Sequence, residues 1–208
     1  MAIKYLGAKR IQGNSGASDG QDYSSQTGNA TSQLDESANK YGVEIESTNP
    51  LIGKALESFT MALRKRNSPT GNIYAKKYNS SGTLQATSSN YIDASTLPTE
   101  GNVVFENKTW NFSSGTLTIA DGDRIVFEGG SHDGTNQITF RRATGGLTDT
   151  VSIATYTSSW TSSPSGDPLY GLAVTGGYPS LTENSIFEES DTGKHYMWDG
   201  TSAWNEVA

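Results

Sequence analysis

Cysteine is absent from all 208 residues of this chain. A disulfide framework, thiol catalysis and cysteine-ligated zinc are therefore excluded. Long apolar runs are absent as well, since none approaches the roughly 20 residues that a membrane-spanning helix requires. The first ten residues also lack the apolar stretch of a secretory signal peptide. We therefore expect neither insertion into a membrane nor export through a signal peptide.

Charge is sparse, and basic charge is the scarcer of the two signs. Asp, Glu, Lys and Arg make up 18% of the residues, against about 25% in an average soluble domain, and the formal net charge is −7. A chain without a basic excess lacks the electrostatic footprint of phosphate-backbone binding, so we expect no nucleic-acid partner. The one basic run, Arg64-Lys65-Arg66, is interpreted as the solvated end of a strand.

The residues present in quantity are Ser, Thr, Asn and Gly. Hydrophobic residues reach only 33%, which suffices for a thin core between two layers but not for a thick one. Thr suits a pleated surface, while Gly and Asn suit turns. The composition therefore predicts an all-β protein with many turns.

Between residues 34 and 176, short segments of alternating hydrophobicity are separated by turn sequences, the pattern of a β-sandwich or barrel. Phe59, Met61 and Leu63 alternate with small or polar neighbours, which gives one buried and one wetter face. The expected strands are 59–64, 73–78, 83–88, 103–112, 124–128, 138–140, 151–156 and 169–174. Eight or nine strands is the number that a jelly roll uses, so the sequence predicts a jelly-roll-like β-sandwich. Only residues 51–66 also fit a helical period, and the turns on either side favour a strand for at least their second half.

The first 33 residues differ from the rest. Residues 1–13 form a short apolar and basic arm, whose apolar members are Ile3, Tyr5, Leu6 and Ile11. Residues 14–33 are nearly all polar or Gly and bury too little apolar area to offset the entropy of ordering, so they are interpreted as a flexible linker. A tethered arm is suited to docking on a neighbouring molecule. The alternative is that the arm adds an edge strand to the domain's own sheet.

Residues 177–208 predict a separate small β-meander. Three short strands are expected at 185–189, 194–198 and 203–207, and Asp199-Gly200 between two of them is a strong hairpin signal. Phe187, Tyr196, Trp198 and Trp204 would form its aromatic core. Such a module is too small to be stable without packing on something else.

Several segments between residues 40 and 176 resemble jelly-roll modules akin to carbohydrate-binding and galactose-binding-like domains. They are residues 52–65, 68–75, 78–88, 92–97, 112–117, 120–126, 160–167 and 172–176. The chain departs from that pattern by an insertion at residues 168–171. The resemblance implies a fold and not a function, because unrelated proteins share such modules.

A second resemblance concerns both ends of the chain. Residues 185–204 are similar to a short module that recurs in structural proteins of tailed bacterial and archaeal viruses, and residues 4–13 resemble the start of proteins from marine archaeal viruses. This implies a virion structural protein, an outer capsid component (decoration, turret or fibre) or a tail component. It would be made in the host cytoplasm and assemble with copies of itself and with other virion proteins. The alternative is a carbohydrate-binding or adhesin module that recognises host surface glycans.

The first resemblance also implies two candidate sites. Jelly-roll modules of this kind often hold a structural Ca²⁺, for which Asp121 and Asp123 are the candidate ligands; the alternative is an ordinary hydrogen-bonded turn, where Asp is common. Trp160, with Tyr156, is the candidate platform for stacking on a sugar, and the alternative is interfacial or buried packing. No other cofactor is expected.

The sequence contains no convincing catalytic constellation. Ser131, His132 and Asp133 are adjacent, and neighbouring side chains of an extended segment point to opposite faces, so they cannot form a nucleophile, base and orienter with one another. The 22 acidic residues are scattered, mostly at turns, without a marked pair of the kind that a glycosidase uses. We therefore expect a protein that is not an enzyme.

Overall fold

The computed structural model describes residues 19–22, 30–34, 39–102, 105–113, 117–143, 151–163, 168–175, 186–188, 195–198 and 204–207. The chain divides into two compact units. Ser18–Gly176 form one unit, and Met1–Ala17 together with Gly177–Ala208 form the other.

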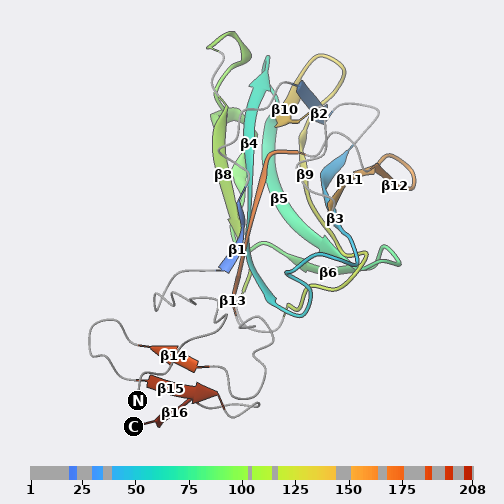
Figure 1. Cartoon of the computed structure of the whole chain (residues 1–208). Helices are drawn as coiled ribbons and strands as arrows, with labels where there is room; N and C mark the ends of the chain where they lie inside the picture. The colour runs from blue at the N-terminus through green and yellow to red at the C-terminus, as the bar shows by residue number, and fades with distance from the viewer. Residues whose placement is uncertain are drawn as a thin grey trace. The chain divides into compact units, whose positions relative to one another are not determined.

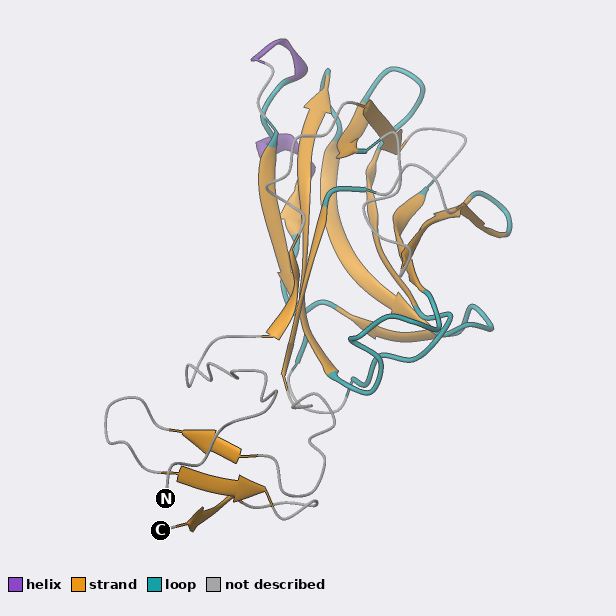
Figure 2. Ribbon diagram, in the orientation of Figure 1, coloured by secondary structure: helices purple, strands orange, loops and turns teal. Residues whose placement is uncertain are grey.

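The larger unit is a β-sandwich of two antiparallel sheets (Figures 1 and 2). Sheet A contains β1 (Asp19–Asp22), β2 (Ala30–Leu34), β4 (Ala55–Arg66), β8 (Glu106–Asn111), β10 (Gln137–Arg142) and β13 (Tyr170–Thr175). Sheet B contains β3 (Lys40–Ile45), β5 (Thr70–Tyr78), β6 (Leu84–Thr87), β7 (Ile92–Asp93), β9 (Arg124–Ser131), β11 (Val151–Tyr156) and β12 (Trp160–Ser163). Two short 3₁₀ helices, η1 (Ala94–Thr96) and η2 (Glu100–Asn102), lie between β7 and β8.

The two sheets have different strand orders. Sheet A runs β1-β13-β4-β10-β2, and β8 also pairs with β4. The long strand β4 makes this possible, because it pairs with β13 along its first half and with β10 along its last residues. Sheet B runs β12-β11-β3-β9-β5-β6, with β7 also on β5.

The core between the sheets is held by a ladder of aromatic rings. Phe59 on β4 stacks near Trp110 on β8, and Trp110 lies near Phe127 on β9, each pair with ring centroids 6.0 Å apart. Phe127 in turn meets Phe140 edge-on at 5.6 Å. The indole Nε1 of Trp110 donates a hydrogen bond of 3.0 Å to the backbone carbonyl of Ile73 on β5. Trp110 of sheet A is therefore bound to sheet B both by ring packing and by a hydrogen bond.

The prediction of an all-β sandwich is confirmed, whereas the finer jelly-roll description stays a prediction. Residues 51–54 form turns and β4 begins at Ala55, so the segment that also fitted a helical period is a strand in its second part. The described sandwich has more strands than the eight or nine expected. Among the strands that the sequence pattern did not show are β3, β7 and β12.

The expected linker at residues 14–33 is corrected in part, because β1 and β2 lie within or across it. β1 pairs with β13, and β2 pairs with β10. Strand pairing uses backbone N–H and C=O groups, which every residue except Pro carries, so polar and Gly-rich segments can add to a sheet edge without burying apolar side chains. The arm residues Ile3, Tyr5, Leu6 and Ile11 lie outside the described residues, and their docking role stays a prediction.

The other unit contains a three-stranded antiparallel meander, made of β14 (Ile186–Glu188), β15 (His195–Trp198) and β16 (Trp204–Val207). These strands coincide with the three that the sequence predicted. The backbone register places Phe187 opposite Tyr196 and Trp198 opposite Trp204. The side-chain packing of these four aromatic residues lies outside what the structure describes, so the predicted aromatic core is untested. No helix within the described residues has the length and apolar character needed to cross a bilayer.

Candidate functional site

The face of sheet B that points away from the core carries a dense group of aromatic and charged side chains. Strand alternation explains their placement: Val43, Ile125 and Phe127 point into the core, so their neighbours along the same strands point outward. We call this group the sheet B cluster. It comprises Lys40 and Glu44 on β3, Lys76 and Tyr78 on β5, Arg124 and Glu128 on β9, Tyr156 on β11, and Trp160 and Ser162 on β12.

Three aromatic rings form the centre of the sheet B cluster. Trp160 meets Tyr78 and Tyr156 edge-on, each with ring centroids 5.1 Å apart. Together with Tyr78, Trp160 packs over Val126 and Ala154, which are buried on this outer face. The structure therefore brings together the two residues that the sequence proposed for sugar stacking, Trp160 and Tyr156.

The ring surfaces of this centre are already in contact with cations of the chain. The ammonium of Lys40 lies 5.3 Å from the ring centroid of Tyr78 and 5.1 Å from that of Tyr156. The guanidinium carbon of Arg124 lies 5.2 Å from the Trp160 ring. Trp160, the candidate platform for stacking on a sugar, is half-buried. The rings are consequently held in one arrangement by cation–π contacts and edge-on packing.

Glu128 is the electrostatic hub of the sheet B cluster. Its Oε2 accepts hydrogen bonds from the Lys40 ammonium at 2.5 Å and from the Tyr78 hydroxyl at 2.8 Å, and its Oε1 accepts one from Lys76. Burial on its own raises the pKa of Glu128, but the hydrogen bonds from these three donors outweigh it and hold the pKa below its usual value. Burial and the adjacent Glu128 carboxylate raise the pKa of the Tyr78 hydroxyl. Glu128 is therefore an ionised anchor, and Tyr78 a neutral donor.

A second network extends the cluster to its edge. Glu44 Oε2 accepts hydrogen bonds from Arg124 Nε and from the Ser162 hydroxyl, both at 2.5 Å. Arg124 also donates to the backbone carbonyl of Ser80 at 3.0 Å, in the turn between β5 and β6. In the same turn, Gly82 has a φ of +81°, and a Cβ there would lie 2.9 Å from Trp160 Nε1. The turn between β5 and β6 therefore contacts both the Arg124–Glu44 ion pair and the indole of Trp160.

The sequence patterns found only part of this cluster. Trp160 and Tyr156 stood out as aromatic residues beside hydroxyl-rich segments. Tyr78, Lys40 and Arg124 were not selected, although the alternation of β5 and β9 would have placed Tyr78 and Arg124 on the outward face. Lys40 lies on β3, which the pattern did not show, and only the strand order puts it beside β9 and β11.

The predicted calcium ligands have different roles in the structure. Asp121 is exposed in the turn before β9, whereas Asp123 is only 2% exposed and lies 2.5 Å from the ammonium of Lys77, itself 1% exposed. The backbone N–H of Ala120 also donates to Asp123 at 2.7 Å. A cation at Asp123 would have to displace Lys77, and no group of three His, Asp or Glu side chains comes together in the described part of the chain. Asp123 therefore forms a buried ion pair within a hydrogen-bonded turn, which was the alternative interpretation, and the calcium hypothesis stays a prediction.

Asp133, beside His132, organises its own loop. Its Oδ1 accepts hydrogen bonds of 2.7 Å from the backbone N–H groups of Thr135 and Asn136, and its Oδ2 accepts one of 3.0 Å from the Asn136 side chain. The hydrogen bond from the Asn136 backbone is the main reason why the pKa of Asp133 is lowered. This is the Asx-type turn in which Asp is favoured. Asp133 therefore stabilises the conformation of its loop.

Comparison of the chain with family models, with curated proteins and with solved structures finds no match. The resemblances drawn from the sequence therefore remain predictions. What the geometry offers is a rigid, aromatic and charged face on one sheet, suited to recognition by shape, stacking and ion pairing.

Proposed function

We propose that this chain is a virion structural protein, an outer capsid component (decoration, turret or fibre) or a tail component, that assembles with copies of itself and with other virion proteins. The observation that carries the proposal is the sheet B cluster. Tyr, Trp and Arg are the residue types that dominate binding energy at protein interfaces. Tyr78, Tyr156, Trp160 and Arg124 gather on the outward face of sheet B.

The rigidity of the cluster strengthens the case for a contact surface. Association is opposed by the entropy of ordering side chains at an interface, and that cost is smaller where the side chains are held beforehand. Trp160 is fixed by two edge-on ring contacts and by Arg124, and Glu128 is fixed by three donors. A partner would meet a surface that needs little reorganisation.

The two edges of sheet B also favour lateral contacts. β6 and β12 each pair with one strand within the described residues, and neither contains a charged residue or Pro. Proteins commonly use charge to keep an edge strand from pairing with another molecule. The edge strand β8 of sheet A follows that practice with Glu106 and Lys108, whereas β6 exposes 46% of Leu84. β6 and β12 are thus edges of sheet B without charged side chains to block pairing with another molecule.

The assignment to a virus particle rests on the sequence resemblance of residues 185–204 and 4–13. A virion protein of this kind is made in the host cytoplasm. In this proposal the arm residues Tyr5 and Leu6 dock on a neighbouring molecule.

Assembly is tested by light scattering of the full chain over a wide range of concentrations. We expect a concentration-dependent rise to a closed oligomer, weakened by Leu84→Lys at the edge of sheet B. Ile52→Lys is the matched control, because Ile52 is similarly exposed at 37% but lies in a turn outside the strands. Paired Tyr5→Ser and Leu6→Ser substitutions should also weaken assembly. A chain that stays monomeric at all concentrations, or that responds equally to Leu84→Lys and Ile52→Lys, contradicts the proposal.

The alternative function is recognition of host surface glycans, and a second aromatic pair favours it. Tyr91 is exposed and lies 5.9 Å from the ring of Tyr74, on the same sheet as Trp160. Open aromatic rings flanked by polar groups are suited to stacking on sugars. Binding to a glycan array that is lost in Tyr91→Ala or Trp160→Ala, by a protein that remains monomeric, would favour this alternative over assembly.

A further inference from the structure

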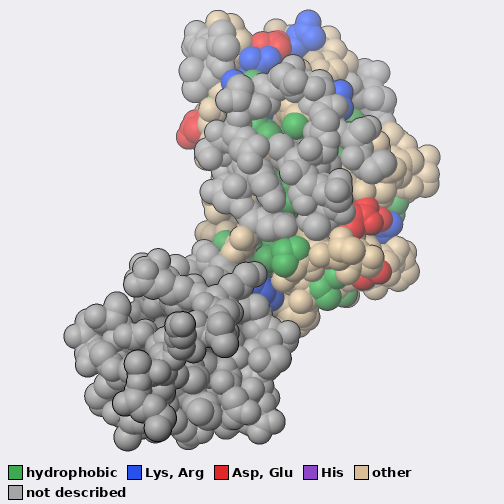
Figure 3. Space-filling model, viewed as in Figure 1, with side chains coloured by type: hydrophobic (Ala, Val, Ile, Leu, Met, Phe, Trp, Pro, Cys, Tyr) green, Lys and Arg blue, Asp and Glu red, His purple; other side chains and the backbone are tan. Residues whose placement is uncertain are grey.

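A group of arginine residues lies on sheet A, where β4 ends. Figure 3 shows Lys and Arg side chains gathered at the end of the sandwich that is uppermost in this view, around a small acidic area. The group consists of Arg64 and Arg66 on β4, Arg141 on β10, the ring of Phe105 and the carboxylate of Glu100 on η2. We call it the arginine patch. It is unusual in a chain whose net charge is −7.

Phe105 positions two of the guanidinium groups. The guanidinium carbons of Arg64 and Arg141 lie 4.4 Å and 5.0 Å from its ring centroid. A guanidinium over a ring uses its flat surface for the contact and keeps its N–H groups for carboxylates. Arg64 Nη2 donates a hydrogen bond of 2.8 Å to Glu100 Oε1, while the buried Nε of Arg64 has no hydrogen-bond partner. Within the described residues, no carboxylate pairs with Arg141.

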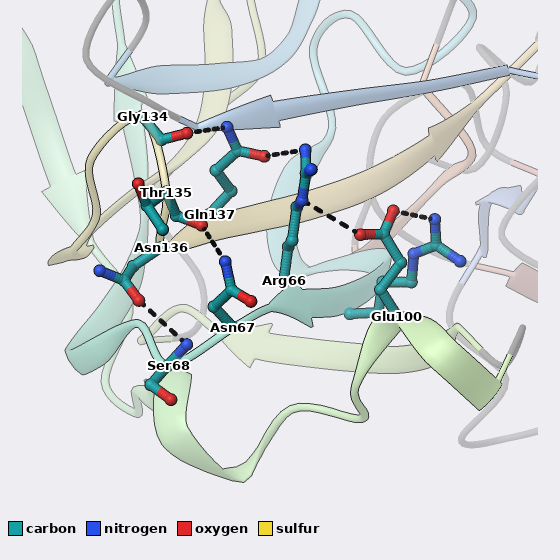
Figure 4. A network of polar contacts seen from close by, with 9 residues as sticks. Arg66, Asn67, Ser68, Glu100, Gly134, Thr135, Asn136 and Gln137 are labelled. Carbon is teal, nitrogen blue, oxygen red and sulfur yellow. Dashed lines mark hydrogen bonds and ion pairs between the residues drawn. The ribbon is translucent and has the colours of Figure 1, made fainter.

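The side chain of Arg66 has only long polar contacts, whereas the loops around it are joined by short hydrogen bonds. Its contacts to Glu100 and to Gln137 are both 3.5 Å, at the outer limit for such interactions, and its side chain is 55% exposed (Figure 4). The loops around it are tied by shorter bonds, among them Asn67 Nδ2 to the Thr135 carbonyl at 2.7 Å. Arg66 can therefore exchange its present partners for a stronger carboxylate without rearrangement of the loops.

The chain itself contains a segment of complementary charge. Between residues 183 and 206 it has six acidic residues against the single Lys194, a formal net charge of −5 out of a total of −7. These acidic residues are Glu183, Glu188, Glu189, Asp191, Asp199 and Glu206. Three guanidinium groups with one carboxylate between them are suited to such a segment, because Arg binds carboxylates through paired N–H donors.

We propose that the arginine patch of one copy binds carboxylates of residues 183–206 of a second copy. The inference rests on the proposed function of assembly and names the two surfaces that meet. Because the surfaces differ, the contact is head-to-tail, and repetition produces a ring if the rotation closes and a filament if it does not.

Two charge-reversed variants of the full chain test the inference. In the first, Arg66→Glu and Arg141→Glu make the patch acidic. In the second, Glu188→Lys, Glu189→Lys and Asp191→Lys change the formal net charge of residues 183–206 from −5 to +1. Each variant alone brings like charges together at every contact, so we expect its association constant, measured by sedimentation velocity, to fall at least tenfold. A mixture of the two provides an opposite-charge partner for every contact and is expected to recover assembly. The control, Lys54→Glu with Lys108→Glu, changes the net charge as much as the first variant but lies outside the patch.

The outcomes separate this inference from the proposed function. A wild-type chain that never assembles overturns both. A wild-type chain that assembles and is insensitive to either reversal overturns the inference alone, as does a control as disruptive as the patch variant. Two impaired variants that do not recover on mixing also overturn it, since a contact within one chain, or with another partner, is not repaired between copies. Recovery on mixing, lost at high ionic strength, supports it.

Discussion

The buried ion pair between Lys77 and Asp123 allows a sharp test of what holds the sandwich together. Lys77 is 1% exposed and Asp123 is 2% exposed, and the ammonium and carboxylate lie 2.5 Å apart. Lys77 also donates to the side chain of Gln85, and Asp123 also accepts from the Ala120 backbone. Lys77→Met keeps the length of the side chain and removes its charge. Asp123 is then left buried with one neutral donor.

The expected loss is large because the remaining charge has no access to water. Removing one partner of a buried ion pair costs about 3–5 kcal/mol of unfolding free energy. Gln85 contributes little to this figure, since its side chain is exposed and water replaces the lysine. In the double variant Lys77→Met with Asp123→Asn both charges are gone, and the amide oxygen can still accept from Ala120. We expect the double variant to be more stable than Lys77→Met by about 2 kcal/mol.

The assay is urea denaturation of the full chain, followed through the transition of the sandwich. Lys108→Met is the control, because it breaks an ion pair with Glu106, which is largely exposed, and such pairs contribute about 0–1 kcal/mol. Two results would contradict this account of the buried pair. One is a loss of less than about 1 kcal/mol in Lys77→Met; the other is a loss in the double variant equal to the sum of the losses in Lys77→Met and in Asp123→Asn alone.

Three further predictions concern other parts of the sandwich. The lowered pKa of Glu128 means that the stability it contributes is complete above about pH 4.3, the usual carboxyl pKa, and is lost as the pH falls through the lower value in the folded protein. The unfolding free energy of Glu128→Gln should therefore lie below that of the wild type at neutral pH, and the difference should shrink as the pH falls below about 4.3. A difference that does not change with pH would contradict the role of Glu128 as an ionised anchor. Gly82→Ala should shift the tryptophan fluorescence and destabilise more than Gly53→Ala, because both glycines have φ above +80° but only Gly82 approaches Trp160; equal effects would contradict the contact. Trp110→Phe should cost about 2–4 kcal/mol in urea denaturation, since it removes a buried hydrogen bond to β5 and leaves a gap in the aromatic ladder; a loss below 1 kcal/mol would show that the ladder repacks.

The fold class could be predicted from the sequence because strand alternation is a local property. Phe59, Met61 and Leu63 are all buried, as their period of two required. The range expected for β11 coincides with the observed strand, and the three C-terminal strands were found to within a residue at each end. Edge strands were missed for a physical reason. β1 and β2 pair through their backbones, and their polar sequences carry no hydrophobic signal.

The candidate site was predictable only in fragments. Trp160 and Tyr156 lie close in sequence and pair across neighbouring strands, so their meeting was foreseeable. The sequence left Asp123 open between a calcium ligand and a turn residue, because its partner in the structure, Lys77, lies 46 positions earlier in the chain. An aspartate in a turn has the same local sequence whether it binds a cation or an ammonium group.

The sequence by itself determined that the chain forms antiparallel strands with one face buried, that it lacks thiol chemistry, and that residues 183–206 carry −5 of its formal net charge of −7. Those properties depend on residue type and on local spacing. Only the tertiary structure decided which strands are neighbours, and hence that Lys40 meets Glu128, that Arg64 and Arg141 share the ring of Phe105, and that Lys77 neutralises Asp123. Contacts between distant segments are set by sheet order, which depends on the packing energy of the whole sandwich and leaves no local trace in the sequence.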